Sequence, residues 1–445
     1  MGLTASISGK ISRYPYVVIS LITASAAFGC YTSMYAFRKA FTAGLYEEAE
    51  FLGINYKLWL ISAQILGYML SKFYGIRFIS ELGHEKRGWK IVLLISIAWI
   101  ALLGFAIVPA PYNIVCMFLN GLPLGLIWGL VFSFLEGRRI TEFLGAVMSI
   151  SLVFASGFIK TVARTLVDDL GVAEYWMPFA TGLLFVVPLL IFVLLLEAVP
   201  PPTKKDIEMR TLRAPMNAAQ RRAFLSDFLP GIILTVFAYL LFTVLRDIRD
   251  NFQVEIWSNL GFVNQDIYAK TDSVIAIIVL ALMSLLILVR RNFVAFALIH
   301  VMILTGCLLA GISTFLYLQE ALSGMNWMVI SGLGLYMAYI PYNAIFFERL
   351  IASYHQAGNI GFIMYVADST GYLGSVAVLF VREFAFVNLS WTAFFQHALL
   401  LCSLLAGLAV CFSLAYFYTK KVRIKDNTGT DAFSVPRGEV QIIKT

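Results

Sequence analysis

The sequence YTSMYAFR occupies residues 31–38 inside one long apolar run, and YLLFTVLR occupies residues 239–246 inside another. In both, an arginine (Arg38, Arg246) follows a tyrosine (Tyr31, Tyr239) by seven residues, which is about two helical turns. The tyrosine and the arginine therefore share one helix face in each copy. This repeat indicates an internal duplication that places two guanidinium groups around one central site.

The composition around these runs is that of a membrane protein. Apolar residues make up 60% of the 445 and charged residues 13%, whereas soluble domains are roughly 25% charged. About 20 apolar residues cross a bilayer as a helix, and the sequence predicts twelve such spans. They are expected near residues 15–40, 57–79, 89–110, 112–135, 142–165, 174–197, 228–250, 266–290, 292–318, 324–347, 357–382 and 392–419.

The presence of two arginines inside apolar membrane spans requires an explanation. An arginine at the bilayer centre costs roughly 2.5–3.5 kcal/mol on insertion scales. We therefore expect Arg38 and Arg246 to face a water-filled cavity and an anionic partner. Guanidinium groups suit this role because their planar fork pairs with two oxygens of a carboxylate or phosphate.

The longest polar interruption divides the chain into two halves. It begins at Val199 with three consecutive prolines, continues through six basic residues and ends at Asp227. The expected organisation is a six-helix half at 1–198, a cytoplasmic linker at 199–227, a second six-helix half at 228–420 and a disordered tail at 421–445. Many secondary transporters consist of such halves and bind substrate where they meet.

The loop charges predict an orientation. Basic residues recur on one side of the twelve spans, most densely between Lys204 and Arg222, and acidic residues such as Glu48 and Asp168 lie on the other. Basic loops face the cytoplasm, so both termini are expected there. The predicted location is the bacterial inner membrane.

Four motifs lie in order along the chain: YTSMYAFRK at 31–39, ISAQILGYMLSKF at 61–73, YWMP at 175–178 and GYLGSV at 371–376. Their order and spacing resemble the major facilitator superfamily, and within it the organophosphate:phosphate antiporters, which include glycerol-3-phosphate and hexose-phosphate transporters. The resemblance implies an all-α membrane protein with twelve helices in two pseudo-symmetric halves. It also implies that Lys72 faces the cavity.

The chain departs from that family at two positions. The fifth-helix histidine that contributes to phosphate binding in the family aligns near Ala155 and Ser156, with Lys160 about one turn further on. Asp368 stands in the eleventh span, where the glycerol-phosphate transporter lacks an acid. Because the fifth and eleventh spans occupy equivalent places in the two halves, we expect Lys160 and Asp368 to face each other as an ion pair or proton-coupling pair.

The candidate substrate-binding side chains combine cations with aromatic hydroxyl groups. They are Arg38, Arg246, Tyr31, Tyr35, Lys72, Lys160, Tyr239 and Tyr342. Such a set predicts binding rather than bond breaking. The sequence contains no Walker, metalloprotease or nucleophile-elbow motif, so we expect no enzyme, no cofactor and no metal site.

The predicted function is secondary transport of an organic anion by a monomer in the lipid bilayer, with no nucleic-acid partner. The leading mechanism is exchange of a phosphorylated metabolite for inorganic phosphate by alternating access. One alternative is proton-coupled symport of a carboxylate or sugar acid with Asp368 as the proton carrier. Another is a transporter-like receptor that senses such an anion.

Overall fold

A computed structural model describes residues 2–46, 50–81, 87–203, 206, 218–354, 361–386 and 388–431. The first half is helical apart from one two-stranded hairpin, in which Glu50 pairs with Asn55 in antiparallel register. Its elements are α1 (Gly2–Ile11), α2 (Tyr16–Arg38), the 3-10 helix η1 (Ala40–Ala43), β1 (Glu50–Phe51), β2 (Ile54–Asn55), α3 (Tyr56–Glu81), α4 (Arg87–Ile107), α5 (Ile114–Leu124), α6 (Ile127–Phe132), α7 (Thr141–Asp168) and α8 (Met177–Ala198).

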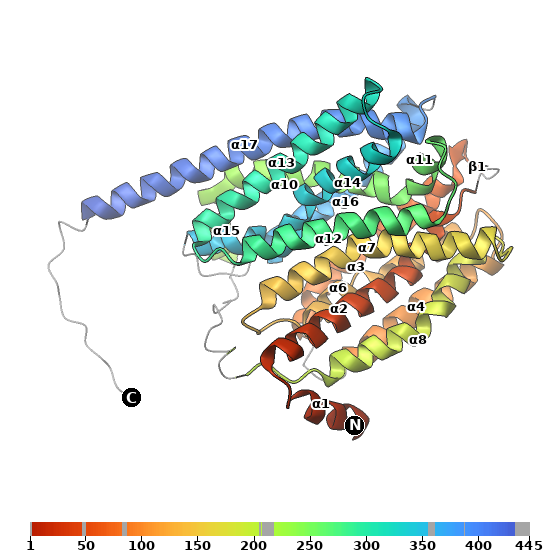
Figure 1. The fold of residues 1–445 in the computed structure, drawn as a ribbon, viewed down its shortest axis with the longest axis horizontal. Helices are drawn as coiled ribbons and strands as arrows, with labels where there is room; N and C mark the ends of the chain where they lie inside the picture. The colour runs from red at the N-terminus through yellow and green to blue at the C-terminus, as the bar shows by residue number, and fades with distance from the viewer. Residues whose placement is uncertain are drawn as a thin grey trace.

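The second half is also helical. Its elements are α10 (Ala218–Asn251), α11 (Gln253–Asn259), α12 (Asp266–Ile287), α13 (Asn292–Leu318), α14 (Gly324–Pro341), the π-helix η2 (Tyr342–Phe346), α15 (Phe347–Ser353), α16 (Gly361–Ala385) and α17 (Trp391–Asp431). The two halves lie side by side, with the first in red to yellow and the second in green to blue (Figure 1). We call the end where α2 begins the near end and the end with β1 the far end.

The helices account for twelve membrane spans. Within the described residues, ten helical segments are long and apolar enough to cross a bilayer, and α3 and α16 complete the twelve. Two spans are interrupted. The fourth breaks between α5 and α6 just after Pro123, and the tenth changes to the π-helix η2 directly after Pro341, because proline removes a backbone donor from the helical ladder.

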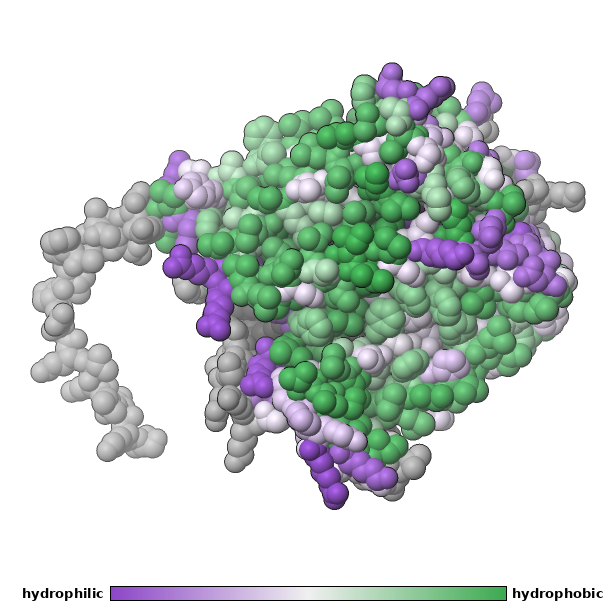
Figure 2. Space-filling model, viewed as in Figure 1, coloured by the Kyte–Doolittle hydropathy of each residue, from purple (hydrophilic) through white to green (hydrophobic). Residues whose placement is uncertain are grey.

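The outer surface matches a bilayer. Large apolar side chains on α4, α8 and α17 point outward, among them Ile100 at 65% exposed, Val187 at 63% and Leu404 at 62%. Figure 2 shows hydrophobic residues over most of the length of the visible face, with hydrophilic residues gathered at its two ends. The chain is therefore an integral membrane protein.

Close helix contacts occur where glycine removes a side chain. Gly121 on α5 lies against α3, and a Cβ atom there would be 2.2 Å from the Gln64 carbonyl oxygen. Gly157 on α7 lies against α12 of the other half, where a Cβ atom would be 2.2 Å from the Tyr268 carbonyl oxygen. Small residues allow such approach between membrane helices, so Gly157 sets how closely the two halves meet.

Two helices extend across the boundaries that the sequence predicts for the linker and the tail. Helix α10 begins at Ala218, inside the segment 199–227 that was assigned to the linker, and residues 204–205 and 207–217 lie outside the described part. Helix α17 continues to Asp431 and projects beyond the bundle (Figure 1), so the first eleven residues of the expected disordered tail are helical. The α10 extension begins with AAQRRA at 218–223 and the α17 extension with KVRIK at 421–425, and Ala, Gln, Arg and Lys are good helix formers.

Candidate functional site

Arg38 ends α2 at the boundary between the halves, and its residue is 5% exposed. Its guanidinium carbon lies 4.0 Å from the ring centre of Tyr68 on α3 and 5.7 Å from that of Tyr35. Among the described residues no carboxylate lies within ion-pair distance of Arg38, and its Nε has no hydrogen-bond partner. Within the described part of the chain, this buried arginine is held against aromatic faces without a counter-charge.

Arg246 occupies the corresponding place on α10 of the second half. Its guanidinium donates to Asp247 Oδ1 at 2.5 Å. Its carbon lies 4.9 Å from the ring centre of Tyr339 and 5.7 Å from that of Tyr372. Arg246 therefore resembles Arg38 in its aromatic surroundings and differs in having a carboxylate beside it.

Two tyrosines connect these arginines across the halves. The rings of Tyr68 on α3 and Tyr372 on α16 lie 5.4 Å apart, and Lys72 Nζ lies 5.1 Å from each ring centre. We call Arg38, Tyr68, Lys72, Tyr372 and Arg246 the central array. The sequence analysis did not select Tyr68 and Tyr372, although both follow glycine in motifs that carry the family resemblance.

Asp368 on α16 lies at the edge of the central array. Lys72 donates to its Oδ2 at 2.5 Å, and the Tyr239 hydroxyl donates to its Oδ1 at 2.5 Å. Asp368 thus pairs with Lys72 and not with Lys160, as was expected. The three cations of the array face two carboxylates, Asp247 and Asp368, which leaves one positive charge in excess.

The other candidate tyrosines are buried around the array. Tyr31 contacts Tyr35 at 5.7 Å and Trp128 at 5.1 Å between ring centres. Tyr239 stacks on Tyr339 at 5.5 Å. Tyr342 lies against Tyr239 and the ring of Phe346, so its surroundings are mostly aromatic.

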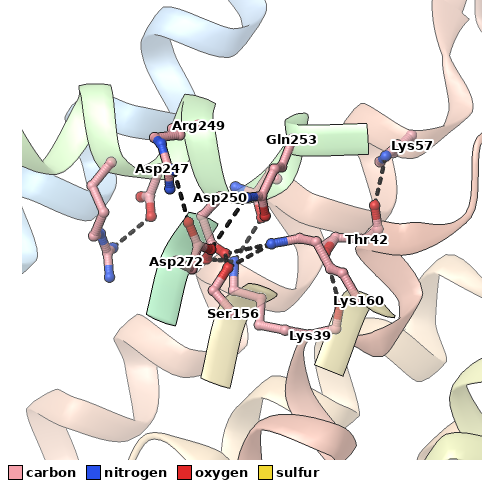
Figure 3. Close-up of polar contacts among 12 residues, drawn as sticks. Lys39, Thr42, Lys57, Ser156, Lys160, Asp247, Arg249, Asp250, Gln253 and Asp272 are labelled. Atoms are coloured by element: carbon pink, nitrogen blue, oxygen red, sulfur yellow. Dashed lines mark hydrogen bonds and ion pairs between the residues drawn. The ribbon is translucent and has the colours of Figure 1, made fainter. Parts of the chain in front are cut away.

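Lys160 belongs to a second polar group, nearer the far end. Lys160 and Lys39 contact the two oxygens of Asp250, each at 2.9 Å. Ser156 donates to Asp250 and accepts from Lys160, and Lys39 also donates to Asn251 at 2.6 Å. Figure 3 shows Lys39, which directly follows α2, and Ser156 and Lys160 of α7 converging on Asp250 of α10. We call Lys39, Ser156, Lys160, Asp250 and Asn251 the far-end cluster.

The expected pairing of Lys160 with Asp368 is wrong because the two residues differ in depth. Lys160 lies 19 residues into α7 and Asp368 seven residues into α16, and both helices begin at the near end (Figure 1). The difference of 12 residues corresponds to about 18 Å along the helix axes. Lys72 lies nine residues before the near-end terminus of α3, at nearly the depth of Asp368.

Further ion pairs surround the far-end cluster. Lys57 on α3 binds Glu255 on α11 and donates to the Thr42 carbonyl oxygen at 2.8 Å. Within the second half, Arg249 binds Asp272 at 2.8 Å. Among the residues that the structure describes, no group of three or more His, Cys, Asp or Glu side chains is placed to hold a metal ion.

Chemically, the arrangement can hold an anion between the two halves. Cations and hydroxyl donors come from both halves: α2 and α3 supply Arg38 and Lys72, and α10 supplies Arg246. A bound anion that contacts both sets would be shared between the halves.

Comparisons with solved structures give the fold. The chain resembles a D-xylose-proton symporter, with 12% identity, 90% of this chain and 97% of that chain covered, and a TM-score of 0.59. It resembles the proton:xylose symporter of the major facilitator superfamily bound to 6-bromo-6-deoxy-D-glucose, with 14% identity, 91% and 97% coverage and a TM-score of 0.60.

A third structure, of the peptide transporter POT in complex with alafosfalin, matches with 14% identity, 93% and 99% coverage and a TM-score of 0.57. All three are transporters and none is an enzyme. These matches confirm the expected twelve-helix fold of the major facilitator superfamily; the finer resemblance to organophosphate:phosphate antiporters is left open by them.

Sequence comparisons give the family. No curated protein sequence matches the chain. A family model described as a family of unknown function (DUF5690) matches residues 40–420. The chain therefore belongs to the DUF5690 family and has the major facilitator superfamily fold.

Proposed function

We propose that this protein is a secondary transporter of an organic anion, most simply a phosphorylated metabolite exchanged for inorganic phosphate by alternating access. The single observation that carries the proposal is Arg38, a buried guanidinium group with aromatic neighbours and no carboxylate partner among the described residues. A buried charge without a partner costs several kcal/mol. A ligand that brings a negative charge would remove that cost.

The neighbours of Arg38 favour an organic ligand over a bare inorganic ion. Tyr35 and Tyr68 present ring faces, and Tyr372 extends this aromatic surface to Arg246 on the other half. Rings bury apolar parts of a ligand while hydroxyl groups donate hydrogen bonds. An anionic head with an attached carbon skeleton matches both features.

The position of the array between the halves supports alternating access. An anion that binds Arg38 and Arg246 together draws the two halves toward each other, and its release lets them part. Exchange follows when the halves reorient only with an anion bound. The similar structures are those of a sugar–proton symporter and a peptide transporter, which supports transport as the class of function.

The first test is a ligand screen on purified protein. Thermal unfolding is measured with glycerol 3-phosphate, inorganic phosphate, D-glucuronate, succinate and, as a neutral control, D-xylose. A ligand at 100 times its dissociation constant stabilises the folded state by about 2.7 kcal/mol. Stabilisation by one or more anions and not by D-xylose is expected. Stabilisation by D-xylose alone would contradict the proposal.

The second test separates transport from sensing and exchange from symport. Proteoliposomes loaded with the stabilising anion should take up the same labelled anion against its gradient by counterflow, which a receptor does not do. Exchange requires an internal anion. Uptake into empty vesicles driven by an acidic exterior would instead favour proton-coupled symport of a carboxylate or sugar acid.

A further inference from the structure

The far-end cluster contains more positive charge than negative charge. Lys39 and Lys160 both contact Asp250, whose carboxylate carries the only negative charge of the cluster. All three side chains are at most 6% exposed. Burying an ion without an opposite charge is strongly unfavourable. The cluster is therefore one negative charge short of balance.

The surrounding groups do not supply that charge. Three pairs lie around the cluster, and in each of them one cation contacts one carboxylate: Lys57–Glu255, Arg249–Asp272 and Arg246–Asp247. Glu174, also at the far end, accepts from the backbone N–H groups of Leu45 and Tyr46 and lies 3.7 Å from Arg164. Among the described residues no further carboxylate contacts Lys39 or Lys160. The excess charge of the cluster is thus additional to the one at Arg38.

The cluster also has N–H donors to spare within the described residues. An ammonium group has three N–H donors, and each lysine uses two of them, Lys39 on Asp250 and Asn251 and Lys160 on Asp250 and Ser156. The Nδ2 atom of Asn251 has no partner, although the residue is 0% exposed. Its orientation is fixed because Lys39 only donates and so requires the amide oxygen. All these donors lie around one carboxylate.

We propose that the far-end cluster binds one small monovalent inorganic anion of the halide class, such as chloride. Ammonium and amide N–H groups can donate to such an ion, and hydrogen bonds from a charged donor are the stronger ones. One monovalent ion balances the excess charge, whereas a phosphate dianion would reverse it. The inference goes beyond the proposed function, because this site is distinct from the central array and needs no organic substrate.

The bound ion would contact both halves of the protein. Lys39 and Lys160 belong to the first half, and Asp250 and Asn251 end α10 of the second. The ion adds to the contacts of Asp250 and replaces none of them. Chloride therefore strengthens the association of the halves at the far end, and its binding stabilises the folded protein.

The first experiment measures binding of radiolabelled chloride to the purified protein, with no organic substrate in the buffer. Methanesulfonate replaces chloride at constant ionic strength. The wild type should bind one chloride ion per chain at saturation, and its melting temperature should rise as chloride replaces methanesulfonate. Lys39→Gln removes the excess charge, so its affinity for chloride should fall by at least about tenfold.

The second experiment supplies the missing charge from the protein itself. Asn251→Asp places a carboxylate beside Lys39, so the variant should melt above the wild type in chloride-free buffer and show no dependence on chloride. It tests the inference even where Lys39→Gln fails to fold. Asn259→Asp is the matched control, because it adds the same charge at an exposed position on α11. It should keep the chloride binding of the wild type.

Arg38→Gln distinguishes the far-end cluster from the central array, and it should bind chloride as the wild type does. Loss of chloride binding in Arg38→Gln, with binding retained in Lys39→Gln, would assign the ion to the central array and overturn the inference. Absence of saturable chloride binding by the wild type would also overturn it. Both results are independent of the ligand screen, which tests the proposed function.

Discussion

Asp250 in the far-end cluster is contacted by two lysines from the other half, whereas Arg38 in the central array is contacted by no carboxylate among the described residues. Both lie on the surface where the halves meet, and both are buried. In the far-end cluster each lysine also has a second polar partner, Asn251 or Ser156. On this difference rests our proposal that the far-end cluster holds the halves together internally and that the central array is completed by a ligand.

The largest expected effect comes from breaking the far-end cluster. Asp250→Asn leaves Lys39 and Lys160 buried without a carboxylate, and removing one partner of a buried ion pair costs about 3–5 kcal/mol. The variant should therefore unfold at a markedly lower temperature in detergent. Asp266→Asn is the control, because Asp266 and Lys270 form an exposed pair of a kind that contributes about 1 kcal/mol or less. Equal melting temperatures for the two variants would contradict a stabilising role of Asp250 in the far-end cluster.

A second change makes Arg246 resemble Arg38. Asp247→Asn removes the carboxylate beside Arg246, so the ligand no longer competes with it for the guanidinium group. A hydrogen bond to a charged group contributes about 1.5–3 kcal/mol, so anion affinity should rise by roughly tenfold or more. Titration calorimetry with glycerol 3-phosphate measures the dissociation constant of the anion. Unchanged or weaker anion binding would mean that Asp247 does not compete with the ligand for the guanidinium group of Arg246.

The smallest effect separates the two pairings of Asp368. A double-mutant cycle of Lys72→Gln with Asp368→Asn, measured by thermal unfolding without ligand, should give a coupling above about 0.5 kcal/mol. The same cycle for Lys160→Gln with Asp368→Asn should be additive within that margin, because those residues lie at different depths. Coupling in the second cycle and none in the first would restore the pairing expected from sequence.

Most of the fold was predictable because the bilayer imposes a simple rule. Each span needs about 20 apolar residues, so runs such as 292–318 define helices with little ambiguity, and α13 has those bounds. The ends of α10 and α17 were not predictable in the same way. Beyond the bilayer the helix continues through polar residues, and hydrophobicity then carries no signal for where it stops.

The central site was predictable only in part. The Tyr–Arg repeat identified Arg38 and Arg246 because charge inside an apolar span is visible in sequence. The partners were not visible, since Asp250 and Lys160 meet through the packing of α7 against the second half. The pairing of Lys160 with Asp368 was expected because the fifth and eleventh spans occupy equivalent places in the two halves. That argument did not consider how far along its helix each residue lies. Tyr68 and Tyr372 were overlooked because tyrosine is common in membrane proteins for other reasons.

The central claim is that the guanidinium group of Arg38 binds the anionic group of the substrate. The dissociation constant of the anion from the Arg38→Lys variant tests this claim most directly. Lysine keeps the charge but loses the paired donors, which should weaken binding of glycerol 3-phosphate or the best anion of the screen by about 10- to 150-fold. Because no carboxylate among the described residues pairs with Arg38, the melting temperature without ligand should stay near the wild-type value. Arg164→Lys, at the far end and paired with Asp168, is the control and should bind normally. Wild-type affinity in Arg38→Lys would contradict the account.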